Sequence, residues 1–331
     1  METIIIKSRF FSYPIHVENG ILSRLDEFWD VTRQVVVISD DGIPVSYVDT
    51  VVNKFPGCLK IIFPQGETSK SLQQYERIVG LLSANHVSRD ALLVALGGGV
   101  TGDLAGFVAA TYLRGIEYVQ IPTSLLAQID SSVGGKVAVN TKQAKNIVGC
   151  FYPPKMVLVD PSLLSTLPER QFRNGLGEMI KYGMVADSLL FEKLENPVLP
   201  SELNFLITRS INIKKRFVEQ DEFDTGSRQA LNFGHTFGHA IEAFYGYEKY
   251  LHGEAVAIGM MRIVSNATIK QRLENALRSQ GLPTADEASN ELLWDYVMKD
   301  KKNRAKALTY VDVNAIGSYV LKTAKSKEEL L

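Results

Sequence analysis

Cysteine is nearly absent from this sequence, with only Cys58 and Cys150 among 331 residues. Two thiols so far apart are too few for a disulfide framework or for a cysteine-rich metal site. A chain without disulfides is typical of a reducing compartment, so we expect a cytoplasmic location.

Long hydrophobic runs and a large excess of one charge are also absent. No stretch approaches the roughly 18 consecutive apolar residues of a membrane helix, and the opening METIIIKSRF lacks the apolar core of a signal peptide. The formal net charge of −1 gives no general attraction to nucleic acid or to an anionic membrane. We therefore expect no nucleic-acid partner and no membrane partner, and we expect a small-molecule partner.

What the first half of the chain does contain is a series of short runs rich in Val, Ile and Leu. Runs that are apolar throughout are typical of strands covered on both faces, and hence of a largely parallel sheet. Between them, SLQQYERIVGLLSANHV and LAGFVAATYL have the periodicity of crossover helices. The alternation predicts a Rossmann-like α/β domain whose sites lie where strands end and helices begin. The six predicted strands are TIIIKS, QVVVISD, LKIIFP, ALLVALG, EYVQIP and MVLVD.

Four prolines mark a change of pattern near residues 155–165, namely Pro153, Pro154, Pro161 and Pro168. Beyond them strand-like runs nearly vanish and helical periodicity takes over, apart from a hairpin expected near ALTYVDVNAIGSYVL. We therefore predict an α/β domain over residues 1–160 and a mainly α-helical domain over residues 161–331.

A glycine-rich turn follows the predicted strand ALLVALG. Gly97, Gly99 and Gly102 have the G-x-G-x-x-G spacing, between a strand and a helix. Such a turn lets the backbone approach a pyrophosphate, which the free N–H groups of the helix start can bind. The alternative is a tight turn without a ligand. Asp40, at the end of VVVISD, stands where an acidic residue could bind ribose hydroxyls, although it could equally be a plain turn former.

Charged and amide side chains crowd the segment over residues 122–149, which also carries apolar residues and two adjacent glycines. A solvated surface loop is the simpler interpretation. The apolar stretches that lead in and out favour a cleft-lining loop that binds a polar, anionic small molecule. The polar residues are Asp130, Lys136, Asn140, Lys145 and Asn146.

Three of the five histidines, His235, His239 and His252, fall within 18 residues. On a helix His235 and His239 would share a face, joined by Glu242. Thr236 stands where the H-E-x-x-H motif needs its general-base glutamate, which disfavours a zinc peptidase.

Three histidines and one carboxylate would suit a zinc ion with an open position. Glu178, in GLGEMIKYG, offers the carboxylate, and Lys181 follows it one helical turn later on the same face. The alternative is that the histidines only form hydrogen bonds within a helical core.

Six segments taken together resemble the 3-dehydroquinate synthase family of sugar phosphate cyclases, in order and over residues 60 to 305. This resemblance implies a dehydroquinate synthase-like fold, with a Rossmann-like NAD-binding domain and a helical domain that binds metal and substrate. It also implies a tightly bound NAD and a divalent metal, zinc or cobalt. The segments are GGGVTGDLAGFVAATYLRG, PTSLLAQIDSSVGGKVAVN, KNIVGCFYPP, GLGEMIKYG, LNFGHTFGHAIE and LHGEAVAIGM.

The resemblance also assigns roles to residues around the histidines. It makes Glu178, His235 and His252 the metal ligands, whereas spacing alone would pair His235 with His239. His239 would face the substrate instead, and Arg114 would reach into the active site of a partner subunit, which implies a homodimer. The remaining substrate residues would be Asp130, Lys136, Asn146, Lys181, Lys214, Arg228 and Asn232, with Lys301 or Lys302 contacting phosphate.

By the same resemblance, NAD would be held by residues from several turns of the first domain, with Lys145 between the cofactor and the substrate. Asp40, at the end of VVVISD, joins this set. The residues are Glu67, Lys70, Gly98, Gly99, Val100, Asp103, Thr123, Ser124, Lys136, Lys145 and Thr166.

The implied reaction converts 3-deoxy-D-arabino-heptulosonate 7-phosphate to 3-dehydroquinate by transient oxidation, phosphate elimination, reduction and aldol closure. Three other functions stay open: a different cyclase such as 2-deoxy-scyllo-inosose synthase, a metal-dependent dehydrogenase of the glycerol dehydrogenase type, and a non-catalytic binding module. A neutral polyol would not need the cations Lys136, Lys181, Lys214 and Arg228, which disfavours the dehydrogenase.

Overall fold

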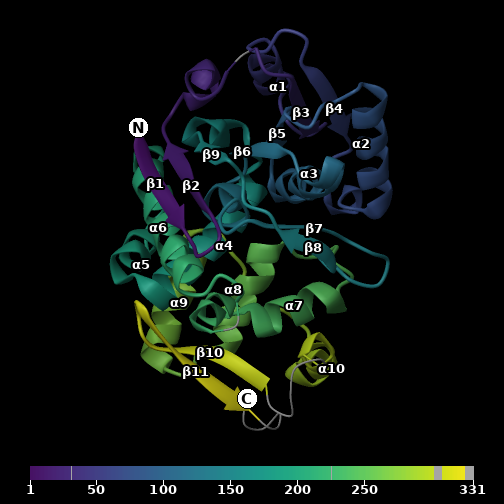
Figure 1. The fold of residues 1–331 in the computed structure, drawn as a ribbon. Coiled ribbons are helices and arrows are strands. Elements are labelled where there is room, and N and C mark those ends of the chain that lie inside the picture. Colours follow the sequence, from purple (N-terminus) through teal and green to yellow (C-terminus); the bar gives the residue numbers. More distant parts are fainter. Residues whose placement is uncertain (31, 225, 302–307, 325–331) are drawn as a thin grey trace. The chain divides into compact units, whose positions relative to one another are not determined.

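The structure is a computed structural model that describes residues 1–30, 32–224, 226–301 and 308–324. The chain forms two compact units, Met1–Leu167 and Pro168–Leu331 (Figure 1).

A seven-stranded sheet forms the centre of the first unit, in the order β1-β2-β9-β6-β5-β3-β4. Only the β1–β2 pair is antiparallel, and the other neighbours run parallel. All six predicted strands are present, which confirms the α/β prediction. The strands are β1 (Glu2–Lys7), β2 (Ser12–Val17), β3 (Val35–Asp40), β4 (Leu59–Phe63), β5 (Leu92–Gly97), β6 (Glu117–Pro122) and β9 (Met156–Val159).

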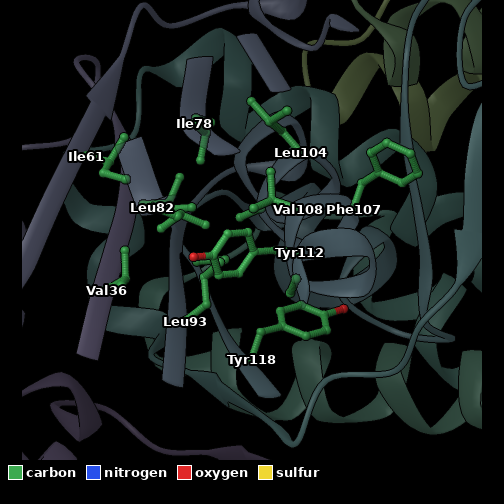
Figure 2. Close-up of a cluster of buried hydrophobic side chains, with 14 of the residues drawn as sticks. Val36, Ile61, Ile78, Leu82, Leu93, Leu104, Phe107, Val108, Tyr112 and Tyr118 are labelled. Carbon is green, nitrogen blue, oxygen red and sulfur yellow. The ribbon is translucent and has the colours of Figure 1, made fainter. Parts of the chain in front are cut away.

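The strand β3 shows why these runs are apolar throughout. Val36 and Ile38 belong to one buried cluster, and Val35 and Val37 to another. Successive side chains of a strand point to opposite faces, so a sheet with a core on each side needs apolar residues at every position. Figure 2 shows the first of these clusters, where side chains from strands and helices meet.

Three helices connect the strands of this unit: α1 (Val45–Val52), α2 (Leu72–Ala84) and α3 (Gly99–Thr111). The predicted crossover helix at α2 is confirmed, and the Ser71 side chain caps it by accepting a hydrogen bond from the Gln74 backbone. The helix α3 begins five residues before the predicted run, since it starts directly at the glycine turn.

Three other elements of the first unit were not predicted: β2, α1 and a hairpin of β7 (Lys136–Val139) with β8 (Val148–Phe151). The hairpin corrects the interpretation of residues 122–149 as one long loop. Its strands have only four residues each, too few for a clear alternation. The true loop of the hairpin is confined to residues 140–147.

The second unit is mainly helical, as predicted, and the expected hairpin is present near its end. None of the described helices is long and apolar enough to cross a membrane. The elements are α4 (Glu169–Ala186), α5 (Ser188–Leu194), α6 (Leu203–Gln220), α7 (His235–Phe244), α8 (His252–Ile263), α9 (Ala267–Ser279), α10 (Asn290–Lys301), β10 (Leu308–Ala315) and β11 (Ser318–Ala324).

A buried carboxylate ties the end of β9 to the turn that follows β2. Asp160 is 1% exposed and accepts hydrogen bonds from the backbone of Gly20 and Leu22, at 2.9 and 3.1 Å. It also accepts from the backbone and hydroxyl of Ser162, at 3.1 and 2.5 Å. Four donors therefore depend on one side chain.

Asp160→Ala is predicted to destabilise the first unit by about 3 kcal/mol, because hydrogen bonds to a charged group are lost and a buried N–H is left unpaired. Chemical denaturation followed by circular dichroism would measure the change. The matched control is Asp41→Ala, which removes an exposed acceptor of the Gln65 N–H. Water can replace that partner, so the control should cost at most about 1 kcal/mol. Equal losses in both variants would contradict the assignment.

Candidate active site

The strand order of the first unit makes the β3–β5 pair, beside the glycine turn, a switch point of the sheet. β3 leads to β4 on one side of this pair and β5 leads to β6 on the other, so the connections leaving β3 and β5 diverge at their carboxyl ends. In doubly wound sheets ligands bind at such a point. Asp40 ends β3 and Gly97 ends β5, so the two features that the sequence suggested for a dinucleotide meet at one place.

Contacts around this turn are close. Thr101, in the first turn of α3, donates a hydrogen bond to the Asp40 carboxylate at 2.6 Å. A side chain at Gly97 would collide with Thr101, so only glycine fits there. Thr123 donates its backbone N–H to the Gly97 carbonyl at 3.0 Å, and the Ser124 hydroxyl would lie 3.5 Å from a Cβ at Gly98. The predicted residues Asp40, Gly98, Thr123 and Ser124 therefore surround one helix start.

A polar network extends from this helix to the β7–β8 hairpin. The buried Lys70 ammonium binds both the Asp103 carboxylate and the side-chain oxygen of Asn146. Asn140 donates its side-chain amide to Glu67 at 2.7 Å, and its oxygen accepts the Asn146 backbone N–H at 2.8 Å. The structure thus brings three predicted NAD residues together with Asn146, which was predicted for the substrate.

The other predicted residues of this unit lie at separate places. Asp130 is on the π-helical turn Ala127–Ser131, Lys136 begins β7, and Lys145 lies in the hairpin loop. Val100 is in the first turn of α3, next to Gly99. The Thr166 hydroxyl donates to Tyr47 at 3.1 Å. Arg114 is exposed, with a left-handed backbone at φ 67°.

In the second unit, one face of α4 carries three polar residues spaced four apart: Arg170, Asn174 and Glu178. This spacing puts them on one side of the helix, and each contacts the first turn of α8. Arg170 binds Glu254 through two hydrogen bonds of 2.8 Å. Asn174 accepts the backbone N–H of Gly253 at 2.6 Å.

Glycines let α4 and α8 approach at this point. A Cβ on Gly177 would lie 2.5 Å from the carbonyl oxygen of Gly253, and one on Gly253 would overlap with the carbonyl of Asn174. The two backbones are therefore in contact, which brings Glu178 to His252, the first residue of α8.

Glu178, His235 and His252 converge on one point. The Nε2 atoms of both histidines lie 3.6 Å from the Glu178 oxygen Oε1, and the three ligand atoms lie within 4.8 Å of one another. That oxygen is buried and has no hydrogen-bond partner among the described residues. An unpartnered buried carboxylate oxygen is costly, and a divalent cation bound by all three atoms would satisfy it. Two imidazoles and one carboxylate form a donor set that suits zinc.

The second nitrogen of each histidine determines which tautomer is present. The Nδ1 of His235 lies 3.1 Å from the carbonyl oxygen of Phe233, and the Nδ1 of His252 lies 3.1 Å from a carboxylate oxygen of Glu242. Both oxygens can only accept, so each Nδ1 carries the proton. In a neutral ring the lone pair of Nε2 is then available to a metal.

Burial and nearby charges shift the pKa values of His235 and His252 in opposite directions. Burial, and then the nearby Lys181 ammonium, hold the pKa of His235 well below its usual range. Burial alone would lower the pKa of His252 as well, but the Glu242 hydrogen bond and the charges of Glu242 and Glu178 together raise it. At neutral pH His235 is therefore uncharged, which is the form that binds a metal.

His239 lies beside this group, and its ring centroid is 5.2 Å from that of His235. A second set of possible ligands consists of His239, Glu242 and His252. Neither set contains both His235 and His239, the pair that spacing alone suggested. The structure therefore places His235 with Glu178 and His252, in the grouping that the family resemblance implied.

Three basic residues of the second unit that were predicted to bind the substrate are buried. Lys181 is 2% exposed and pairs with the second oxygen of Glu178. Lys214 on α6 and Arg228 on the turn Ser227–Asn232 are 6% and 4% exposed. Arg228 donates to the carbonyl of Glu222 at 3.0 Å.

Two other residues predicted to contact the substrate, Asn232 and Lys301, each end an element. Asn232 ends the turn Ser227–Asn232 and is exposed. Lys301 ends α10, but its side chain and all of Lys302 lie outside the described residues, so the phosphate contact stays a prediction.

Sequence reasoning did not assign roles to Asn174, Arg170 or Thr101. The four-residue spacing of Arg170, Asn174 and Glu178 is a signal that could have pointed to a shared face of α4. No comparable signal in the sequence indicates the contact of Thr101 with Asp40, since it depends on the strand order.

Comparison with known proteins identifies the family of the chain. Two family models match in succession, 3-dehydroquinate synthase N-terminal over residues 60–174 and 3-dehydroquinate synthase C-terminal over residues 175–303. The 3-dehydroquinate synthase of Clostridium acetobutylicum is 41% identical, with 99% of this chain and 98% of that protein covered.

Two solved structures are similar in fold. One is 2-deoxy-scyllo-inosose synthase complexed with carbaglucose-6-phosphate, NAD+ and Co2+, at a TM-score of 0.88 and 25% identity, covering 98% of this chain and 96% of that one. The other is 2-epi-5-epi-valiolone synthase from Streptomyces hygroscopicus with NAD+ and Zn2+, at 0.86 and 26%, covering 97% and 95%. With both family models matched and a full-length relative at 41% identity, this chain belongs to the 3-dehydroquinate synthase family.

Proposed function

We propose that this chain converts 3-deoxy-D-arabino-heptulosonate 7-phosphate to 3-dehydroquinate and phosphate, a step of the shikimate pathway. The observation that carries the proposal is family membership over both halves of the chain, with the ligand set Glu178, His235 and His252 intact. The 3-dehydroquinate synthase of Clostridium acetobutylicum matches along nearly its whole length.

NAD and a divalent metal, zinc or cobalt, are part of this proposal. The similar cyclase structures contain NAD+ with Co2+ or Zn2+. The turn at Gly97–Gly99 and the residues around it would hold NAD, and Glu178, His235 and His252 would hold the metal. When bound, NAD supplies reversible hydride transfer, and the metal supplies Lewis-acid polarisation of substrate oxygens.

The buried cations indicate an anionic substrate. Lys181 holds one oxygen of Glu178 and leaves the other for the metal. Burial strengthens the attraction between an ammonium or guanidinium and a carboxylate or phosphate, so Lys181, Lys214 and Arg228 are proposed to bind those groups. His239, beside the metal ligands, is proposed to face the substrate. A neutral polyol has no carboxylate or phosphate for these cations to bind.

A different cyclase reaction is the second candidate, since both solved cyclases share the fold at TM-scores of 0.86 or more. The identity of 41% to a 3-dehydroquinate synthase, against 25% to 2-deoxy-scyllo-inosose synthase, favours the first. Turnover of the heptulosonate phosphate with release of phosphate is the deciding assay.

A homodimer and a cytoplasmic location complete the proposal. Arg114 is exposed on a turn where Leu113, Arg114 and Gly115 all have positive φ, and Leu113 is also exposed. An exposed apolar residue beside a fixed arginine suits a subunit interface. Cys58 and Cys150 are both free thiols, which fits a reducing compartment.

His252→Ala is predicted to remove metal binding and activity. The loss in metal affinity should exceed about 100-fold. Removing a residue that only forms a hydrogen bond to a metal ligand already costs about 10–100-fold, and His252 is itself a ligand. Zinc per chain, measured by elemental analysis after dialysis, would report it. His16→Ala, the same change on β2 of the other unit, should keep its zinc. Stoichiometric zinc in His252→Ala would contradict the ligand assignment.

NAD is predicted to be required but not consumed, because oxidation and reduction cancel within one turnover. Phosphate should accumulate from the heptulosonate phosphate while absorbance at the NADH band stays flat. The control omits NAD after it has been stripped from the protein, and it should release no phosphate. One NADH formed for each phosphate would indicate a dehydrogenase instead.

Arg114 is predicted to act in the active site of the partner subunit. Arg114→Ala and Lys181→Ala should each be inactive, yet mixing them with subunit exchange should restore about a quarter of wild-type activity, because one site of each mixed dimer carries neither change. Arg114→Lys should also weaken turnover, since lysine lacks the paired donors of a guanidinium. Confirmed exchange by mass spectrometry without returning activity would exclude a shared site.

A further inference from the structure

We propose that Glu242 is a positioning residue for the metal centre, which holds the His252 ring so that Nε2 faces Glu178. This inference rests on the metal site of the proposed function and extends it to a residue to which neither the resemblance nor the comparisons assign a role.

The His252 ring lies between two carboxylates, one at each nitrogen. Glu242, near the end of α7, contacts Nδ1 at 3.1 Å, and Glu178, on α4, lies 3.6 Å from Nε2. Glu242 is 8% exposed and Glu178 is fully buried. Three helices therefore contribute to the position of one imidazole.

The two contacts are chemically different. The contact with Glu242 is a hydrogen bond, in which the ionised carboxylate accepts the Nδ1 proton. The distance to Glu178 is too long for a hydrogen bond and leaves room for an ion between the two atoms. Without an acceptor at Nδ1 the proton could move to Nε2, and that nitrogen could no longer bind a metal.

His235 shows that the same result can be reached by other means. Its Nδ1 proton is held by the backbone carbonyl of Phe233 at 3.1 Å, which no substitution of a side chain can remove. At His252 the Glu242 side chain holds the Nδ1 proton. Mutation can therefore test the effect at His252 but not at His235.

The backbone at His252 is held independently of Glu242. The N–H of Leu251 binds Glu254 at 2.8 Å, and the N–H of Gly253 binds Asn174 at 2.6 Å. The start of α8 is thus fixed on both sides of the histidine, so loss of Glu242 should release the ring while the helix stays in place.

The test is a Co2+ titration of the protein freed of metal and bound NAD, followed by visible absorption. Glu242→Ala should weaken Co2+ binding about 10–100-fold and alter the absorption bands that report ligand geometry. Glu242→Gln, whose amide oxygen can still accept the Nδ1 proton, should lose much less affinity. The control is Glu195→Gln, which makes the same change in a carboxylate that binds Arg272 and should leave the titration unaltered.

Thermal unfolding of each metal-free variant separates a positioning role from a structural one. An unchanged midpoint with weakened Co2+ binding supports the proposal. Glu242→Ala with wild-type affinity and spectrum would overturn it, and so would equal affinity losses in the Ala, Gln and control variants. If Glu242→Ala does not fold, Glu242→Asp retracts the same charge by one methylene, and unchanged Co2+ binding there would likewise overturn the proposal.

The result is independent of the reaction that the chain catalyses. Wild-type protein that binds Co2+ tightly but does not convert the heptulosonate phosphate would refute the proposed function and leave the role of Glu242 intact. Wild-type protein that binds no Co2+ would overturn the role of Glu242, whatever the substrate.

Discussion

The close contact between α4 and the first turn of α8 is the constraint on which the candidate metal centre depends. Gly177 and Gly253 let the two backbones touch, and Asn174 secures the contact with a hydrogen bond. Only at this separation can the short Glu178 side chain come within 3.6 Å of the His252 ring. A single methyl group at either glycine would push apart two ligands that the sequence separates by more than 70 residues.

In each unit one buried ammonium is paired with a carboxylate. Lys70 pairs with Asp103 in the first unit, and Lys181 pairs with Glu178 in the second. Each pair still has a further polar partner or an unsatisfied oxygen, since Lys70 also binds Asn146 and Glu178 keeps one oxygen unpartnered among the described residues. Such pairs offset part of the cost of burying each charge and keep donors and acceptors in position for a ligand.

Much of the fold could be predicted because burial on two faces forces a visible pattern. The six apolar runs became strands, since β3 and its neighbours face a core on either side. The elements β2 and α1 were missed because neither has this pattern. β2 carries Pro14 and alternates buried with half-exposed residues. The helix α1 is rich in Val, Tyr and Thr, which intrinsically favour strands. There, tertiary packing outweighs local preference.

The sequence by itself determined the kinds of atoms available to the site: three histidines close together, one glutamate in a glycine-rich helix, and a glycine turn after a strand. Spacing along one helix suggested the pair His235 and His239, because neighbours on a helix face are all that a local pattern can indicate. Only the tertiary structure decided that α4 and α8 bring Glu178 and His252 to His235, and that Glu242 holds the Nδ1 proton of His252. Those choices depend on backbone contacts between distant segments and on which nitrogen of each ring meets an acceptor, and neither leaves a periodic trace in the sequence.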